Sequence, residues 1–200
     1  MVDARFMTEG LIPLPFLDSP TRFGSISVSL HWLTALAIPT LFALGWWMTG
    51  LDYYHPWYLR APEWHVGSGL LLFGLLILRV LWRAAQSAPL PLPTKHAWET
   101  RAAIWNHHLM LTLSLLASFS GYLIVTAAGQ AASVFDAFTV PAIPAFMDRQ
   151  EDLAGTLHWY SAVLLMALIA LHAAAALKHH LIDRDATLTR MLGIRQESKP

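Results

Sequence analysis

Four long apolar stretches constrain this chain more than any other feature of its sequence. They cover residues 26–49, 64–82, 104–126 and 153–177. A helix needs about 20 mostly apolar residues to cross a bilayer, and each stretch has roughly that length. The apolar runs are continuous and do not alternate with polar residues, which favours helices over the strands of a membrane barrel. We therefore expect an all-α integral membrane protein built as a four-helix bundle.

The composition restricts both the class of protein and the kind of site. Hydrophobic residues make up 56% of the 200 residues and charged residues 13%, whereas soluble domains contain roughly 25% charged residues. So little charge argues against a disordered chain, a nucleic-acid-binding module and a secreted mini-protein. The absence of cysteine excludes disulfides, iron–sulfur clusters, covalently attached c-type haem and cysteine zinc sites. The ten histidines are therefore the main candidate ligands.

Charge also predicts how the chain lies in the membrane. With the N-terminus inside, only Arg60 and Arg149 of the 13 lysines and arginines fall in outer segments. The positive-inside rule then places both termini in the cytoplasm. Residues 1–20 lack the pattern of a signal peptide, so we expect the first span to be retained. The predicted organisation is an N-terminal cytoplasmic tail (1–21), a membrane domain (22–192) and a C-terminal tail (193–200).

Four histidines lie at two levels of the predicted bundle. His31 is near the inner end of the first span and His65 at the outer end of the second, while the fourth span carries His158 near its outer end and His172 near its inner end. The last two are 14 residues apart, about 21 Å along a helix with about 40° of rotation, so they share a face. Because successive spans run antiparallel, His65 lies at the level of His158 and His31 at the level of His172.

Two facing histidine pairs predict bis-histidine ligation of two haems stacked across the membrane. A single histidine at the end of a span is often only an interfacial side chain, but four on two levels favour ligation. Arg79 follows His65 by 14 residues and shares its face, so it is either a partner for the inner haem's propionates or a side chain extending to the interface.

Small residues and the remaining histidines have weaker interpretations. Glycines beside the histidine positions would let a flat macrocycle or another helix approach closely; they are Gly67, Gly69, Gly74 and Gly155. His107 and His108 open the third span and match neither pair, so they are either inner-interface residues or a quinone site. The other histidines are expected to be solvated at the interface; they are His55, His96, His179 and His180.

Several segments carry a family resemblance. The sequence SLHWL around His31, the run from Trp64 to Arg83, and LHAAAALKHH ending at His180 and followed by DRDATL resemble the bacterial cytochrome b561 family. The resemblance covers about residues 22–192. It implies a four-helix bundle in the bacterial inner membrane. It also implies two b-type haems, with iron ligands that match the two pairs above: His31, His65, His158 and His172.

The resemblance leaves two functions open. One is a free-standing superoxide:ubiquinone oxidoreductase, with superoxide or another periplasmic donor entering near Arg60 and ubiquinone reduced near His107 or His108. The alternative is a cytochrome b subunit that relays electrons between quinone and a partner such as a hydrogenase or formate dehydrogenase, with the loop 127–152 as a docking surface. The expected partners are membrane lipid, quinone and, in the alternative, a periplasmic or membrane redox protein; nucleic acid is not expected.

Overall fold

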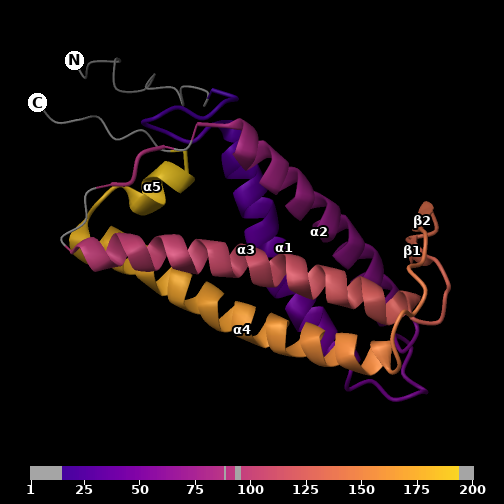
Figure 1. Ribbon diagram of the computed structural model, residues 1–200. Coiled ribbons are helices and arrows are strands. Elements are labelled where there is room, and N and C mark those ends of the chain that lie inside the picture. Colours follow the sequence, from indigo (N-terminus) through magenta and orange to yellow (C-terminus); the bar gives the residue numbers. More distant parts are fainter. Residues whose placement is uncertain (1–14, 88, 93–95, 194–200) are drawn as a thin grey trace, which may run out of the picture.

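Four long helices dominate the protein. The computed structural model describes residues 15–87, 89–92 and 96–193 (Figure 1). Its long helices are α1 (Ser25–Met48), α2 (Arg60–Ala85), α3 (Ala97–Thr126) and α4 (Gln150–Lys178). Each is long and apolar enough to cross a membrane, so the predicted all-α membrane bundle is confirmed. Most of the predicted tail 1–21 and nearly all of the tail 193–200 lie outside the described residues.

Two of the helices begin several residues before the apolar spans that the sequence predicts. α2 begins at Arg60 and α3 at Ala97, four and seven residues before the predicted spans at 64 and 104. The added turns are polar, with Glu63 and Glu99 in the first turns, where carboxylates favour the positive end of the helix dipole. Hydropathy detects only the part of a helix that lies in hydrocarbon, so it misses these ends.

The packing of the helices is uneven. α3 and α4 lie side by side along most of their length, α1 packs on α2, and α2 packs on α3 (Figure 1). At the end of the bundle that the sequence predicts to face outwards, α1 and α4 meet through aromatic side chains, with the rings of Trp46 and Trp159 centred 5.3 Å apart. The bundle therefore surrounds an interior to which all four helices contribute.

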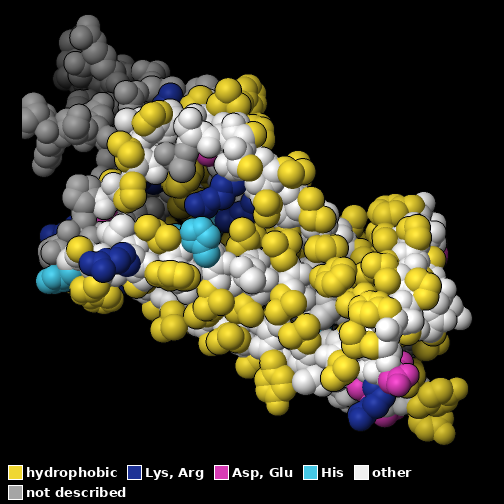
Figure 2. All heavy atoms as spheres, in the orientation of Figure 1, with side chains coloured by type: hydrophobic (Ala, Val, Ile, Leu, Met, Phe, Trp, Pro, Cys, Tyr) yellow, Lys and Arg dark blue, Asp and Glu magenta, His cyan; other side chains and the backbone are white. Residues whose placement is uncertain are grey.

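The surface of the bundle is apolar, and its interior contains small polar residues. Figure 2 shows hydrophobic side chains across the middle of the visible face and charged side chains mainly towards its ends. Leu36, Leu81 and Leu171 are each more than 60% exposed, an arrangement that suits contact with lipid rather than water. Ser114 and Ser120 are buried, and their hydroxyls donate to carbonyls of their own helix.

A small β-hairpin, which the sequence analysis did not predict, lies between α3 and α4. Its strands are β1 (Ala132–Val134) and β2 (Phe138–Val140). The ring of Phe135, at the turn, is centred 5.3 Å from that of Trp64. A Cβ added at Gly67 would lie 3.1 Å from the Phe135 ring. Gly67 therefore makes room for this hairpin, where the sequence analysis left open a macrocycle or another helix.

The opposite end of the bundle is closed by segments near both termini. After α4 the chain forms a π-helical turn, η2 (His179–Asp183), and a short helix, α5 (Thr187–Met191). The indole of Trp32 donates to the carbonyl of Met191 at 2.8 Å. The carboxylate of Asp18 accepts hydrogen bonds from the Gly24 amide and the Ser27 hydroxyl at the start of α1. The Trp32 bond therefore joins α1 to α5, and the Asp18 bonds hold the preceding segment against the start of α1 (Figure 1).

Candidate functional site

His65 of α2 and His158 of α4 face each other in the half of the bundle that the sequence predicts to lie towards the outer face. Their ring centres are 6.0 Å apart and their planes are inclined by 81°. Nδ1 of His158 lies 2.8 Å from the carbonyl oxygen of Ala117. Because a carbonyl only accepts, this nitrogen must carry the proton, which leaves Nε2 with a free lone pair. Nδ1 of His65 is buried with no hydrogen-bond partner in the described part of the chain.

A cavity of about 200 Å³ lies between the four helices at the level of this pair. Both histidines line it, and its other walls are almost entirely apolar, with contributions such as Leu41, Gly69 and Met166. Two glycines give the imidazoles room: a Cβ at Gly45 would lie 2.9 Å from the His65 ring, and one at Gly121 would lie 3.0 Å from the His158 ring.

These features fit a haem. An imidazole–metal bond is about 2 Å long, so ring centres 6.0 Å apart leave space for a single metal ion between them. The apolar walls suit a porphyrin, and both imidazoles line the cavity between them. The donor set, two neutral imidazoles without a charged residue in the lining, is typical of b-type haem ligation.

A second cluster, the inner cluster, contains one residue from each helix: His31 of α1, Arg79 of α2, His107 of α3 and His172 of α4. The ring centre of His172 is 6.4 Å from that of His31 and 5.0 Å from that of His107. The guanidinium of Arg79 donates to the hydroxyl of Thr34, and its Nη2 lies 3.4 Å from Nδ1 of His31. Polar groups in a membrane interior are costly, so their convergence marks a functional site.

The structure thus places His65 beside His158 and His31 beside His172, the partners that helix spacing predicts. Haem ligation by these four residues stays a prediction. The two histidines of the third span separate: His107 joins the inner cluster, while Nδ1 of exposed His108 lies 2.8 Å from the carbonyl of Ile104 on its own helix. Neither opens α3, because the helix begins ten residues before His107.

The other predicted positions have mixed outcomes. Arg60 is exposed as the first residue of α2 and borders a shallow outer hollow with Tyr53 and Tyr58. Gly69 lines the outer cavity, whereas Gly74 and Gly155 have no neighbour within 4 Å of an added Cβ.

Three residues that position the histidines were not predicted: Gly45, Gly121 and Thr34. A signal was present, because Gly45 and Gly121 are the only glycines of α1 and α3, and Thr34 follows His31 by three residues, on the same side of the helix.

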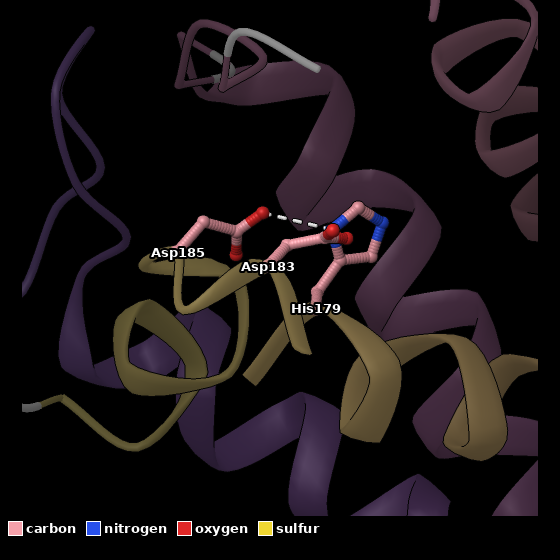
Figure 3. A group of neighbouring side chains, drawn as sticks. All are labelled: His179, Asp183 and Asp185. Carbon is pink, nitrogen blue, oxygen red and sulfur yellow. Dashed lines mark hydrogen bonds and ion pairs between the residues drawn. The ribbon is translucent and has the colours of Figure 1, made fainter. Parts of the chain in front are cut away.

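His179 was expected to be a solvated interface residue, but the structure places it against two carboxylates. Its Nδ1 lies 2.8 Å from Asp185 and 3.2 Å from Asp183, and the three side chains face one another (Figure 3). Lys178 binds the same Asp183 oxygen at 2.8 Å and Glu99 of α3 at 2.7 Å. Because Lys178 already neutralises the oxygen that a metal ion would need, we interpret the group as an ion-pair network that ties the end of α4 to α3.

Asp185 is stabilised in its charged form within this network. Burial raises the pKa of its carboxyl, but hydrogen bonds from Thr187 and His179 outweigh that effect and hold the pKa below its usual value. The network therefore contributes stability at neutral pH, which is lost as acid protonates Asp185.

Comparison with known proteins agrees with this architecture. The sequence pattern of prokaryotic cytochrome b561 matches residues 22–193. Cytochrome b561 homolog 2 of Escherichia coli (strain K12) is 48% identical over 181 residues, 90% of this chain and 96% of the relative. Cytochrome b561 homolog 1 of the same organism is 30% identical over 175 residues, 86% and 97% of the two chains.

A more distant relative carries a more specific name. The probable superoxide oxidase CybB of Yersinia pestis is 26% identical over 179 residues, which cover 86% of this chain and 96% of the relative. The match over most of the chain and the relative at 48% identity show that this bacterial membrane protein belongs to the prokaryotic cytochrome b561 family, which implies haem b binding and electron transfer within the membrane.

Proposed function

We propose that the chain holds two b haems and carries electrons across the bacterial inner membrane, with both termini in the cytoplasm. His65 and His158 would bind the outer haem, and His31 and His172 the inner one. The observation that carries this proposal is the pair of ring spacings, 6.0 and 6.4 Å, at the two levels. Each matches two imidazole–metal bonds of about 2 Å. Bound haem iron supplies one-electron redox chemistry.

The chain's own residues prepare both sites. The carbonyl of Ala117 holds His158 in the tautomer whose Nε2 is free to bind metal. The apolar lining of the outer cavity excludes water from that pair. Arg79 stands beside His31, where a guanidinium can also bind the carboxylate of a haem propionate.

We further propose that superoxide is the electron donor at the outer face. Superoxide is an anion, and Arg60 and Arg149 are the only basic residues that the predicted topology places there. Arg60 is exposed five residues before His65, about 7.5 Å along the helix, so it would attract an anion towards the outer pair. Each superoxide gives up one electron and leaves as dioxygen. The name of the Yersinia pestis relative supports this choice of donor.

Ubiquinone is the proposed acceptor, near His107. This histidine is exposed on α3 and also contacts His172, so it connects the lipid phase with the inner cluster. A neutral histidine can donate a hydrogen bond to a quinone carbonyl. Two electrons and two protons convert ubiquinone to ubiquinol. His108 bonds to its own helix, so we assign the quinone contact to His107.

The alternative function is that of a cytochrome b subunit relaying electrons between quinone and a partner oxidoreductase. One observation favours it: the segment between α3 and α4 is folded and presents exposed apolar side chains, with Phe138, Phe146 and Met147 each at least 47% exposed. A surface of this kind at the outer end of the bundle would suit a docked partner such as a hydrogenase or formate dehydrogenase.

Rapid mixing of the purified, haem-loaded protein with superoxide and then with ubiquinone separates these possibilities. We expect superoxide to reduce the haems at the same rate in the unmodified protein and in the variants His107→Ala and His108→Ala. Reoxidation by ubiquinone should slow at least about tenfold in His107→Ala alone, since loss of one hydrogen-bond donor to the quinone costs about that much.

Two results would contradict parts of this proposal. Unchanged reoxidation in His107→Ala would remove the quinone site from this residue. No superoxide-dependent reduction of the purified protein would reject the oxidase and favour the relay subunit.

A further inference from the structure

We propose that Arg79 directs electron flow by raising the reduction potential of the inner haem above that of the outer haem. The inference rests on the proposed function, in which the four histidines hold two haems. It adds a role for Arg79 that pairing with a propionate does not require. The argument depends on a difference in charge between the two sites.

The outer site contains no formal charge. Its cavity is lined by His65 and His158 together with apolar and small polar residues, and the lining includes no Asp, Glu, Lys or Arg. The group that orients His158 is the neutral carbonyl of Ala117. An electron that arrives here is therefore stabilised by no cation in the cavity wall, because Arg60, five residues before His65, is exposed at the start of α2.

The inner site has a cation built into its wall. The guanidinium of Arg79 is anchored by Thr34, whose side chain is buried, and stands 3.4 Å from His31. Its charge interacts with all three inner histidines, and that of Arg83, one turn further along α2, also reaches His107.

The charge of Arg79 is not cancelled by the protein. The two groups that its guanidinium contacts, the Thr34 hydroxyl and the His31 ring, are neutral. None of the ion pairs among the described residues involves Arg79. A guanidinium keeps its proton in proteins, so the described protein groups leave the positive charge of Arg79 available to a bound haem and its propionates.

This asymmetry has a definite consequence for redox equilibrium. Reduction adds one electron to a haem, and a nearby positive charge stabilises the reduced form, more strongly in a membrane interior than in water. The hydrogen bond to the Ala117 carbonyl acts in the same direction, because it makes the His158 imidazole a stronger donor to a metal and so favours the oxidised form at the outer site. Electrons therefore run from the outer haem to the inner haem.

A redox titration of the purified, haem-loaded protein, followed by its optical spectrum, tests the proposal. The unmodified protein should show two midpoints. Arg79→Gln should move the higher midpoint down by at least about 59 mV, equivalent to a tenfold change in the equilibrium constant for one electron, and leave the lower one in place. Arg79→Lys, which keeps the charge, should retain most of the potential. Arg101→Gln, which removes an exposed arginine of α3, is the matched control and should change neither midpoint.

Two further variants show which midpoint belongs to the inner haem and cover the case in which Arg79→Gln does not bind haem. In His158→Ala, which should retain only the inner haem, the remaining midpoint should be the higher one. If Arg79→Gln does not load with haem, Thr34→Val serves instead, because it keeps the charge but removes the hydroxyl that anchors it beside His31. The higher midpoint should again fall.

The outcomes distinguish this inference from the proposed function. A single haem in the unmodified protein would reject the two-haem proposal itself. Two haems with midpoints that neither Arg79→Gln nor Thr34→Val lowers would keep that proposal and overturn the role of Arg79. A fall in the lower midpoint alone would also overturn it.

Discussion

At the scale of single residues, the space around each imidazole is set by glycines. Gly45 and Gly121 lie where neighbouring helix backbones come closest to His65 and His158. Any side chain at these positions would occupy the volume of the rings. Glycine weakens a helix interior by up to about 1 kcal/mol relative to alanine, so its use here is explained by the close approach and not by helix formation.

We predict that Gly121→Ala weakens the outer haem and spares the inner one. The added methyl group would stand 3.0 Å from Cε1 and 3.1 Å from Nδ1 of His158, so the ring must shift and strain its bond to Ala117. Overpacking of this kind costs about 1–3 kcal/mol, roughly one order of magnitude or more in haem affinity. Haem content and the optical spectrum of the purified protein measure the effect.

The matched control is Gly74→Ala on α2. Gly74 is exposed and has no neighbour within 4 Å of an added Cβ, so this variant should keep both haems. Equal haem content in Gly121→Ala and Gly74→Ala would show that the space beside His158 is not needed for binding.

At the scale of secondary-structure elements, α4 has the largest role, because it contributes a histidine to each level. His158 reaches His65 of α2, and His172 reaches His31 of α1. Hydrogen bonds within the helix fix the separation of its two histidines, whatever the neighbouring helices do. One straight helix thus determines the distance between the two proposed haems.

We predict that His158→Ala and His172→Ala each lose one haem, and not the same one. The unmodified protein should contain two haems per chain, and each variant one. Acidified acetone should extract all of the haem, because no cysteine is present to attach it. Optical spectra and the ratio of haem to protein give the measurement. His179→Ala, seven residues beyond His172, should retain both haems. Identical spectra for His158→Ala and His172→Ala would show that the proposed pairing is wrong.

At the scale of the whole molecule, charge separates the two ends of the bundle. The side chain of Arg190 in α5 donates to the carbonyls of Leu90 and Thr21. These contacts gather the segment before α1, the α2–α3 connection and the end of the chain at one end of the bundle. Most of the lysines and arginines that the structure describes lie at that end. At the other end, Arg60 is the first residue of α2 and Arg149 directly precedes α4.

We predict that this basic end faces the cytoplasm, because positively charged segments resist translocation. A fluorescent protein fused to the C-terminus should fluoresce in cells, and alkaline phosphatase fused there should be inactive. Phosphatase inserted in the loop between β2 and α4 should be active. An active phosphatase at the C-terminus would reverse the topology and place Arg60 in the cytoplasm, which would also end its proposed role as the entry point for superoxide.

The sequence alone determined the properties that follow from distance along the chain. Hydropathy over about 20 residues located α1 to α4, because crossing hydrocarbon requires that length. The helical repeat put His158 and His172 on one face and at two levels. Antiparallel connections then matched each of them with the correct neighbouring histidine, since level in the membrane depends only on position within a span.

Only the tertiary structure decided which side chains meet around each helix. A soluble helix reveals its buried face by amphipathic spacing, but these helices are apolar on both their lipid-facing and inner sides, so the sequence contains little information about their rotation. A step of one residue turns a side chain by about 100°, and that is the difference between His107 in the inner cluster and His108 outside it. The hairpin on Gly67 and the glycines beside the imidazoles likewise depend on the rotation and close approach of neighbouring segments, which the three-dimensional packing alone sets.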